Sequence, residues 1–175
     1  SSTNPQAVTV TAGATASVSF TNKLNTGSVK LIKVTNTGAN LSGWKIGLYT
    51  DADCSNAVAG SPFTTGADGT VTVSGLQKGT YYAKEIPTDD PYWAFDTAVK
   101  SVTVAVGQTA EVTFTNTHYG RIEIRKTTNT GNQLGGWTFR VRDAEGNSYG
   151  DFTTDDNGHA CTQNQPLGRH TADER

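Results

Sequence analysis

The sequence contains no methionine and only two cysteines, and it has few charged residues of either sign. Two cysteines are too few for a disulfide-stapled miniprotein or a cysteine-rich zinc domain. The 14 basic and 16 acidic residues give a net charge of −2, so no strongly basic surface is available for nucleic acid or an anionic membrane. No apolar run approaches the roughly 18 residues of a membrane-spanning helix, and no signal-peptide pattern opens the chain. We therefore expect neither a nucleic-acid partner nor membrane insertion.

Helical periodicity is also absent, which excludes a coiled coil, while Thr, Ser, Asn and 19 Gly are abundant. Apolar and polar residues alternate instead, as is typical of half-buried strands separated by turns. The stretch 87–100 contains two prolines and is expected to be a loop. The sequence predicts an all-β fold built from small antiparallel β-sandwiches of about seven strands. In the central part of the chain the strands are expected at about 27–34, 43–50, 70–73, 80–86, 101–106 and 110–117.

Internal repeats divide the chain into modules. Lys33 and Lys126 stand in nearly identical segments and are separated by 93 residues (126 − 33 = 93). Residues 8–22 match 102–116 with an offset of 94, and residues 79–85 match 168–174. The repeats predict three parts: 1–25 as the last strand of a preceding or neighbouring-chain module, 26–118 as a complete module, and 119–175 as a module without its last strand.

Each module directs polar residues toward its interior. Alternate residues of a strand share a face, and Lys33 shares the face of Val29 and Leu31. By the same parity Glu85 and Asn116 follow the apolar residues of their own strands. A single polar residue of this parity at a strand end is usually just solvated, but the same residue types recur wherever the chain covers these positions. A buried charge without a partner is costly, so something must compensate for it. The repeat extends the pattern to Lys126, Glu174 and Asn22.

Several of these motifs occur together in a known family. They are Gly27-x-Val-x-Leu-x-Lys33, Leu41-Ser-Gly-Trp44-x-Ile-x-Leu-Tyr49, Asp68-Gly69, Gly79-Thr-Tyr-Tyr-x-x-Glu85 and Val112-Thr-Phe-Thr-Asn116. The segment 26–118 thus resembles the Cna B-type (SpaA-like) repeats of Gram-positive surface adhesins and sortase-assembled pilins, with an Ig-like or prealbumin-like sandwich. Trp44 and Trp137 depart from the family, which more often has a small residue there.

The resemblance implies an isopeptide bond between Lys33 and Asn116, with Glu85 as the acid and base. An apolar site favours a neutral amine and a protonated Glu85, which would hydrogen-bond the carbonyl of Asn116 and polarise it. The reaction occurs once per molecule, so the chain is expected not to be an enzyme and to need no cofactor or metal. The implied function is a structural stalk on the bacterial cell surface, outside the cell.

The incomplete ends leave two interpretations open. The chain is either a stretch of a longer repeat array, or residues 8–22 of one copy complete the open module of the next by donor-strand addition. In the second case Lys126, Glu174 and Asn22 would form an intermolecular bond, with Glu174 as the acid and base. The expected partners are therefore neighbouring modules or further copies, arranged head to tail.

A binding function is the main alternative. Tyr92 and Trp93 stand in a proline-flanked loop, where a rigid sandwich often contacts ligands such as a host protein or a glycan. The competing interpretation is that this loop folds over the end of its own module. Calcium binding by the Asp51 or Asp155 turn is a weaker alternative, because Asp-rich turns usually cap themselves. A disulfide between the two cysteines, Cys54 and Cys161, is left open.

Overall fold

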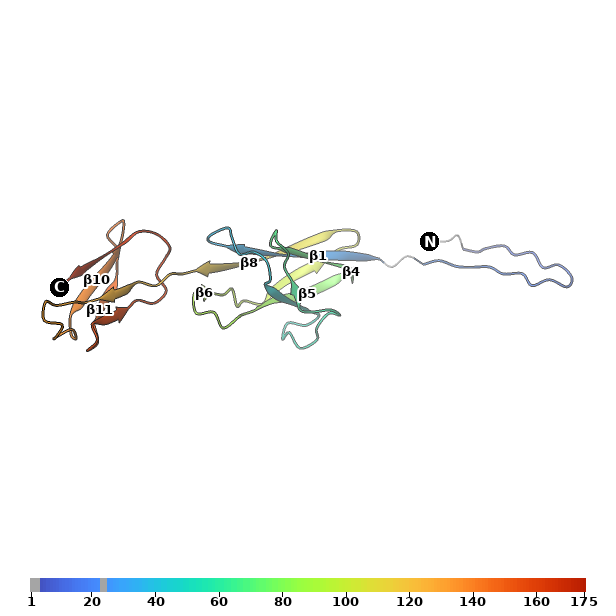
Figure 1. Ribbon diagram of the computed structural model, residues 1–175. Coiled ribbons are helices and arrows are strands. Elements are labelled where there is room, and N and C mark those ends of the chain that lie inside the picture. The colour runs from blue at the N-terminus through green and yellow to red at the C-terminus, as the bar shows by residue number, and fades with distance from the viewer. Residues whose placement is uncertain (1–3, 23–24) are drawn as a thin grey trace.

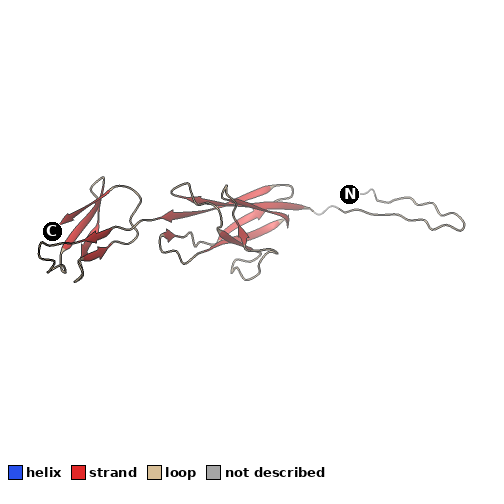
Figure 2. Ribbon diagram, in the orientation of Figure 1, coloured by secondary structure: helices blue, strands red, loops and turns tan. Residues whose placement is uncertain are grey.

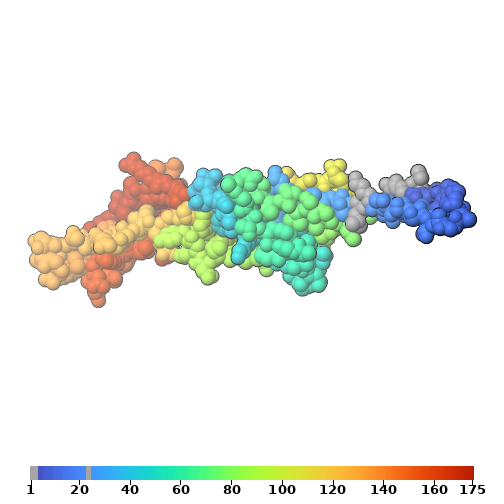
Figure 3. Space-filling model, turned by 45° about the vertical axis from the view of Figure 1, so that its right-hand side comes forward, coloured from blue at the N-terminus to red at the C-terminus, as the bar shows by residue number. Residues whose placement is uncertain are grey.

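A computed structural model describes residues 4–22 and 25–175, and this part of the chain contains strands and no helix (Figures 1 and 2). Accordingly, nothing in the described residues qualifies as a membrane-spanning helix. The two sandwiches follow one another along an elongated molecule (Figure 3). The expected all-β fold is confirmed.

The complete module has two four-stranded sheets with the orders β4-β1-β8-β6 and β3-β2-β5-β7. The first and last long strands, β1 and β8, pair in parallel, so that Lys33 lies opposite Phe114 and Thr35 opposite Asn116. Strand β5 lies in the other sheet, antiparallel to β2 and β7. The strands are β1 (Thr26–Thr35), β2 (Lys45–Tyr49), β3 (Phe63–Thr64), β4 (Thr70–Gln77), β5 (Gly79–Ile86), β6 (Trp93–Ala94), β7 (Lys100–Val104) and β8 (Thr109–His118).

The core of this module lies between the two sheets. Alternate residues of β1 and β8 point inward, as the parity predicts, and Leu31 and Phe114 are fully buried. They pack against the apolar face of the second sheet, which includes Ile46, Leu48 and Ala83. The hydrophobic effect that drives this burial also removes water from any polar side chain of the same parity.

The strand predictions hold for the six long strands and miss two short ones. Strand β6, Trp93–Ala94, lies inside 87–100, so the expectation of a loop throughout that stretch is wrong. It pairs with the end of β8 through Trp93 opposite His118. Two residues are too few for an alternating pattern, which is why neither β3 nor β6 could be seen in the sequence.

The second module contains β9 (Glu123–Arg125), β10 (Thr138–Asp143), β11 (Ser148–Thr153), β12 (His159–Cys161) and β13 (His170–Glu174). They form a β11-β10-β13 sheet and a β12-β9 pair. Its buried core is small and centres on Ile124, Val141 and Ala160. Within the described residues β9 and β13 each pair with one strand, whereas the corresponding β1 and β5 each pair with two. In the second module the sheet edge at β9 and the sheet edge at β13 therefore have no neighbouring strand in the part of the chain that the structure describes.

Residues 4–22 form an extended arm beyond the complete module, on the side away from the second module (Figure 1). No strand occurs in this arm, and it exposes the apolar side chains Val8, Val10, Val18 and Phe20. Residues 1–3 and 23–24 of the segment expected to be a donated strand lie outside the described part. The role of 1–25 as the last strand of another module stays a prediction.

Candidate functional site

Three polar side chains meet inside the complete module. The amino group of Lys33 donates to both carboxylate oxygens of Glu85, at 2.7 and 2.9 Å. The amide nitrogen of Asn116 donates to Oε1 of Glu85 at 2.8 Å. Lys33 is 1% exposed, and Glu85 and Asn116 are 0% exposed. The structure thus brings together the three residues that the strand parity predicts, in a part of the core that excludes water.

The topology explains why these residues meet. Lys33 and Asn116 lie near the ends of β1 and β8, which are parallel neighbours in one sheet. Glu85 lies near the end of β5 in the opposite sheet. The carboxylate therefore crosses the interior between the sheets and contacts both of its partners, although residues 33 and 116 are 83 positions apart (116 − 33 = 83).

The surroundings of Lys33 act on its charge in opposite directions. Burial disfavours the ammonium form and lowers the pKa of Lys33 below that of a free lysine, while the hydrogen bond to Glu85 partly opposes this effect. The ring of Trp44 lies 4.5 Å from Nζ and also favours the charged form. Burial is the largest influence, so the neutral, nucleophilic amine is more accessible here than at an exposed lysine.

The orientation of the Asn116 amide is fixed from two sides. Its oxygen Oδ1 accepts a hydrogen bond from the backbone N–H of Asp96 at 2.9 Å. A backbone N–H can only donate, so the oxygen must face Asp96 and the nitrogen must face Glu85. The geometry differs from the expected contact between Glu85 and the carbonyl: Glu85 lies between the amine of Lys33 and the amide nitrogen of Asn116.

Comparison with protein families decides where the chain belongs. The model of the SpaA prealbumin-like fold domain matches residues 27–118 and 120–175. The chain belongs to the SpaA prealbumin-like domain family. This confirms the resemblance that the sequence motifs indicate, and the family is a structural, non-enzymatic one. A search of curated proteins found no match.

Several solved structures are similar to this chain. The Bacillus anthracis TIE protein is 26% identical with a TM-score of 0.51, over 86% of this chain and 28% of that one. A streptococcal ancillary pilin is 21% identical with a TM-score of 0.49, over 87% and 54%. The minor pilin GBS52 of Streptococcus agalactiae is 25% identical with a TM-score of 0.46, over 55% and 46%. This SpaA-type chain spans at most about half the length of these structures.

The second SpaA-type domain repeats part of the site in a more open form. Lys126 donates to Oε2 of Glu174 at 2.8 Å, and its amino group lies 3.8 Å from the Trp137 ring. The side chains of Lys126 and Glu174 are 16% and 43% exposed. Asn22 lies on the N-terminal arm and is exposed, so the structure does not bring it to this pair within one chain.

The aromatic loop of the complete SpaA-type domain covers the end of its own sandwich. Trp93 stacks on His118 with ring centroids 4.3 Å apart and meets Trp44 edge to face at 5.1 Å. Phe95 contacts the same Trp44 ring at 6.0 Å. Because Trp44 contacts Lys33, these rings cover the buried site. The contacts of Trp93 thus agree with the interpretation in which the 87–100 loop folds over the end of its own module.

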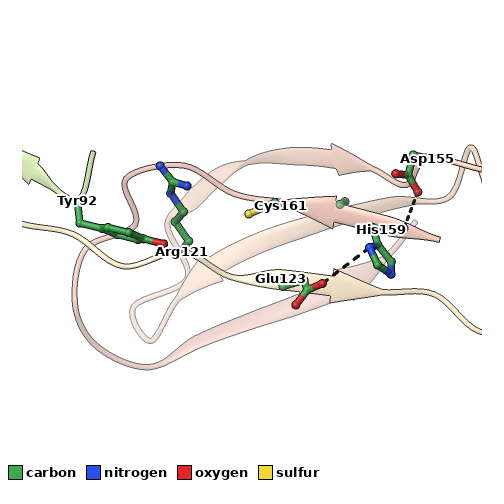
Figure 4. Close-up of a pocket in the computed structure, with 7 residues that line it drawn as sticks. Tyr92, Arg121, Glu123, Asp155, His159 and Cys161 are labelled. Carbon is green, nitrogen blue, oxygen red and sulfur yellow. Dashed lines mark hydrogen bonds and ion pairs between the residues drawn. The ribbon is translucent and has the colours of Figure 1, made fainter. Parts of the chain in front are cut away.

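Tyr92 lines a pocket of roughly 550 Å³, and the other residues of its lining belong to the second SpaA-type domain (Figure 4). The guanidinium of Arg121 lies 4.6 Å from the Tyr92 ring. On the far wall His159 Nδ1 lies 3.9 Å from a carboxylate oxygen of Glu123, and the backbone N–H of His159 donates to Asp155. Tyr92 is 39% exposed, so a ligand could reach it.

The acidic turns cap themselves. Asp51 accepts hydrogen bonds from Ser55 and Asn56, and Asp155 accepts them from the backbone of Asn157 and His159. In the described ranges no group of three metal-ligating side chains comes together. Cys54 and Cys161 are both free thiols.

Proposed function

We propose that this chain is a structural stalk segment, of the pilin type, of a Gram-positive cell-surface protein. In this proposal its complete domain is closed by a self-formed amide bond between Lys33 and Asn116. The observation that carries the proposal is the buried contact of these two residues with Glu85. Membership of the structural SpaA family supports the same function.

The chemistry needs no component from outside. The neutral amine of Lys33 attacks Cγ of Asn116, and a new C–N bond forms while the bond from Cγ to Nδ2 breaks. Glu85 accepts a proton from Nζ and delivers one to Nδ2, which leaves as ammonia. Its carboxylate contacts both nitrogens, so one group can serve as base and acid. Folding holds the reactants in place, and this proximity replaces a cofactor or an external energy source.

The mechanical consequence follows from the position of the bond. A pulling force enters the domain at β1 and leaves it at β8, which are adjacent parallel strands. The amide would transmit this force directly from residue 33 to residue 116. The 82 residues between them (115 − 34 + 1 = 82) would carry no load, so the domain could not be extended.

The intact mass of the purified chain tests the proposal, because each bond releases one ammonia. A wild-type chain with the full unmodified mass would contradict it.

We further propose that the open second domain is completed by the N-terminal arm of another copy. Val18 and Phe20 of the arm correspond to Val112 and Phe114 of β8, with an offset of 94 (112 − 18 = 94). These side chains are exposed in the arm, and the β9 edge that would receive them is uncovered. Exposed strand edges and apolar side chains favour strand addition. Asn22 would then join Lys126 and Glu174, giving a covalent head-to-tail fibre.

A denaturing gel tests the fibre. We expect a ladder of covalent oligomers from the wild-type chain, and a single monomer band from Asn22→Ala or Lys126→Ala. Asn25→Ala is the matched control, because Asn25 is a nearby asparagine outside the repeated segment 8–22, and it should keep the ladder. A monomer band from the concentrated wild-type chain would rule out covalent assembly in trans.

Ligand binding remains a second candidate function because of the Tyr92 pocket. If the pocket binds a glycan or a host protein, Tyr92→Ala should abolish binding on a glycan array or in a pull-down without changing the melting temperature. Trp93→Ala should instead destabilise the domain by about 1–2 kcal/mol, because Trp93 packs against Trp44 and His118. Binding that survives Tyr92→Ala would exclude this site.

A further inference from the structure

Asp96 makes contacts that neither the strand pattern nor the resemblance explains. Its backbone N–H holds the carbonyl oxygen of Asn116 at 2.9 Å. Its carboxylate accepts hydrogen bonds from the Lys100 amino group at 2.6 Å and from the backbone N–H of Thr115 at 3.3 Å. Lys100 in turn donates to the carbonyl oxygen of Thr113 at 2.6 Å. The Asp96 side chain is therefore tied to β8 directly through Thr115, immediately before Asn116, and indirectly through Lys100, which bonds Thr113.

We infer that Asp96 is a positioning residue for amide formation: its carboxylate anchors the loop to β8 so that its own N–H holds Oδ1 of Asn116. This inference rests on the proposed reaction and adds a fourth residue to it. When Lys33 attacks Cγ of Asn116, the electron pair of the C=O bond moves to Oδ1. The N–H of Asp96 is aimed at that oxygen before the reaction begins, as in an oxyanion hole.

The same contact also orients the leaving group. With the oxygen held by Asp96, the amide nitrogen faces Glu85, which delivers the proton that releases ammonia. A flipped amide would turn its oxygen toward the carboxylate and its nitrogen toward another donor. The loop that contains Asp96 therefore stabilises the negative charge that develops on Oδ1 of Asn116. It also fixes the amide in the orientation in which the leaving nitrogen faces Glu85.

An effect of the Asp96 charge on Lys33 would have the opposite sign. The negative carboxylate of Asp96 favours the ammonium form of Lys33 and raises its pKa, although burial remains the dominant influence. If Asp96 acted only through this charge, removing it would increase the neutral amine and accelerate the reaction. If Asp96 acts by anchoring the loop, removing the side chain will slow the reaction. The direction of the change therefore separates the two roles.

The experiment measures ammonia loss with time. The full 175-residue chain is made by cell-free translation and quenched in acidic denaturant at intervals, and the linked Lys33–Asn116 peptide is quantified by mass spectrometry. We expect Asp96→Ala to slow bond formation about 10- to 100-fold. Asp96→Asn, which keeps an acceptor for Lys100 and Thr115 but loses the charge, should react within about threefold of wild type or faster.

Controls separate positioning from folding. Asp51→Ala removes another loop-capping aspartate of the same domain, one that bonds Ser55 and Asn56, and should leave the rate unchanged. Rates are compared at a temperature at which the unreactive double variant Glu85→Gln/Asp96→Ala is folded by circular dichroism. Asp96→Ser replaces Asp96→Ala if the latter does not fold, with the same expected slowing.

An Asp96→Ala chain that reacts as fast as wild type, or faster, overturns the inference, and so does an Asp96→Asn chain that is slowed as much as Asp96→Ala. A wild-type chain that never loses ammonia contradicts the proposed function itself.

Discussion

Replacing Lys33, Glu85 or Asn116 by alanine should restore to the purified chain the mass of one ammonia that the wild-type chain has lost, after the mass of the substitution is subtracted. Lys33 supplies the attacking nitrogen and Asn116 the leaving one, so neither can be replaced. Glu85 contacts both nitrogens, and no other side chain in the described part of the chain hydrogen-bonds either of them, so its loss removes the group that moves the proton. Intact-mass spectrometry of the four proteins measures the effect.

Lys30→Ala is the matched control for this result. Lys30 lies on the same strand β1 but on its opposite face, which points away from the core. Its amino group pairs with the carboxylate of Glu111 at 3.6 Å on the surface. Its variant should show the same loss of ammonia as the wild-type chain. If Lys33→Ala also shows that loss, the bond is formed by another lysine and the assignment is wrong.

The second large effect concerns the stability of the complete domain. The bond would link two residues that are 83 positions apart (116 − 33 = 83), which by analogy with a disulfide stabilises the fold by roughly 4–5 kcal/mol. Asn116→Ala removes the bond but keeps the Lys33–Glu85 pair. Glu85→Ala removes the bond and also leaves a buried lysine without its partner, which costs about 3–5 kcal/mol more. The expected order of stability is therefore wild type, then Asn116→Ala, then Glu85→Ala.

Denaturant unfolding, followed by near-ultraviolet circular dichroism, measures this order. Glu111→Ala is the control, because Glu111 is an acidic residue of the same domain that lies outside the buried site. Glu111 is 58% exposed in its pair with Lys30, and exposed pairs contribute at most about 1 kcal/mol. Equal stabilities of the Asn116→Ala and wild-type chains would contradict a covalent closure of the complete domain.

Strand parity was sufficient to predict the three buried polar residues. Lys33 follows Val29 and Leu31 at intervals of two, and the burial of β1 has the same period. Glu85 and Asn116 follow the same rule in β5 and β8. The reason is that a strand has only two faces, so apolar neighbours fix the direction of a polar residue between or beside them.

Contacts made by loops could not be predicted in this way. The orientation of the Asn116 amide depends on the backbone N–H of Asp96, and every residue except proline has such a group. The packing of Trp93 on Trp44 and His118 depends on how the 87–100 stretch returns to β8. No periodic pattern in the sequence predicts the Asp96–Asn116 hydrogen bond or the packing of Trp93, because both contacts depend on the path of the loop in space.

The amino-acid sequence by itself determined the all-β class, the repeat of 93 to 94 residues and the face on which Lys33, Glu85 and Asn116 lie, since all three follow from spacing along the chain. Only the tertiary structure decided that β1 and β8 are parallel neighbours, that Glu85 faces the leaving nitrogen, and that Lys126 and Glu174 are more exposed than Lys33 and Glu85. These features depend on which strands are adjacent and on how completely the facing sheet excludes water. The spacing of residues along the chain does not contain that information.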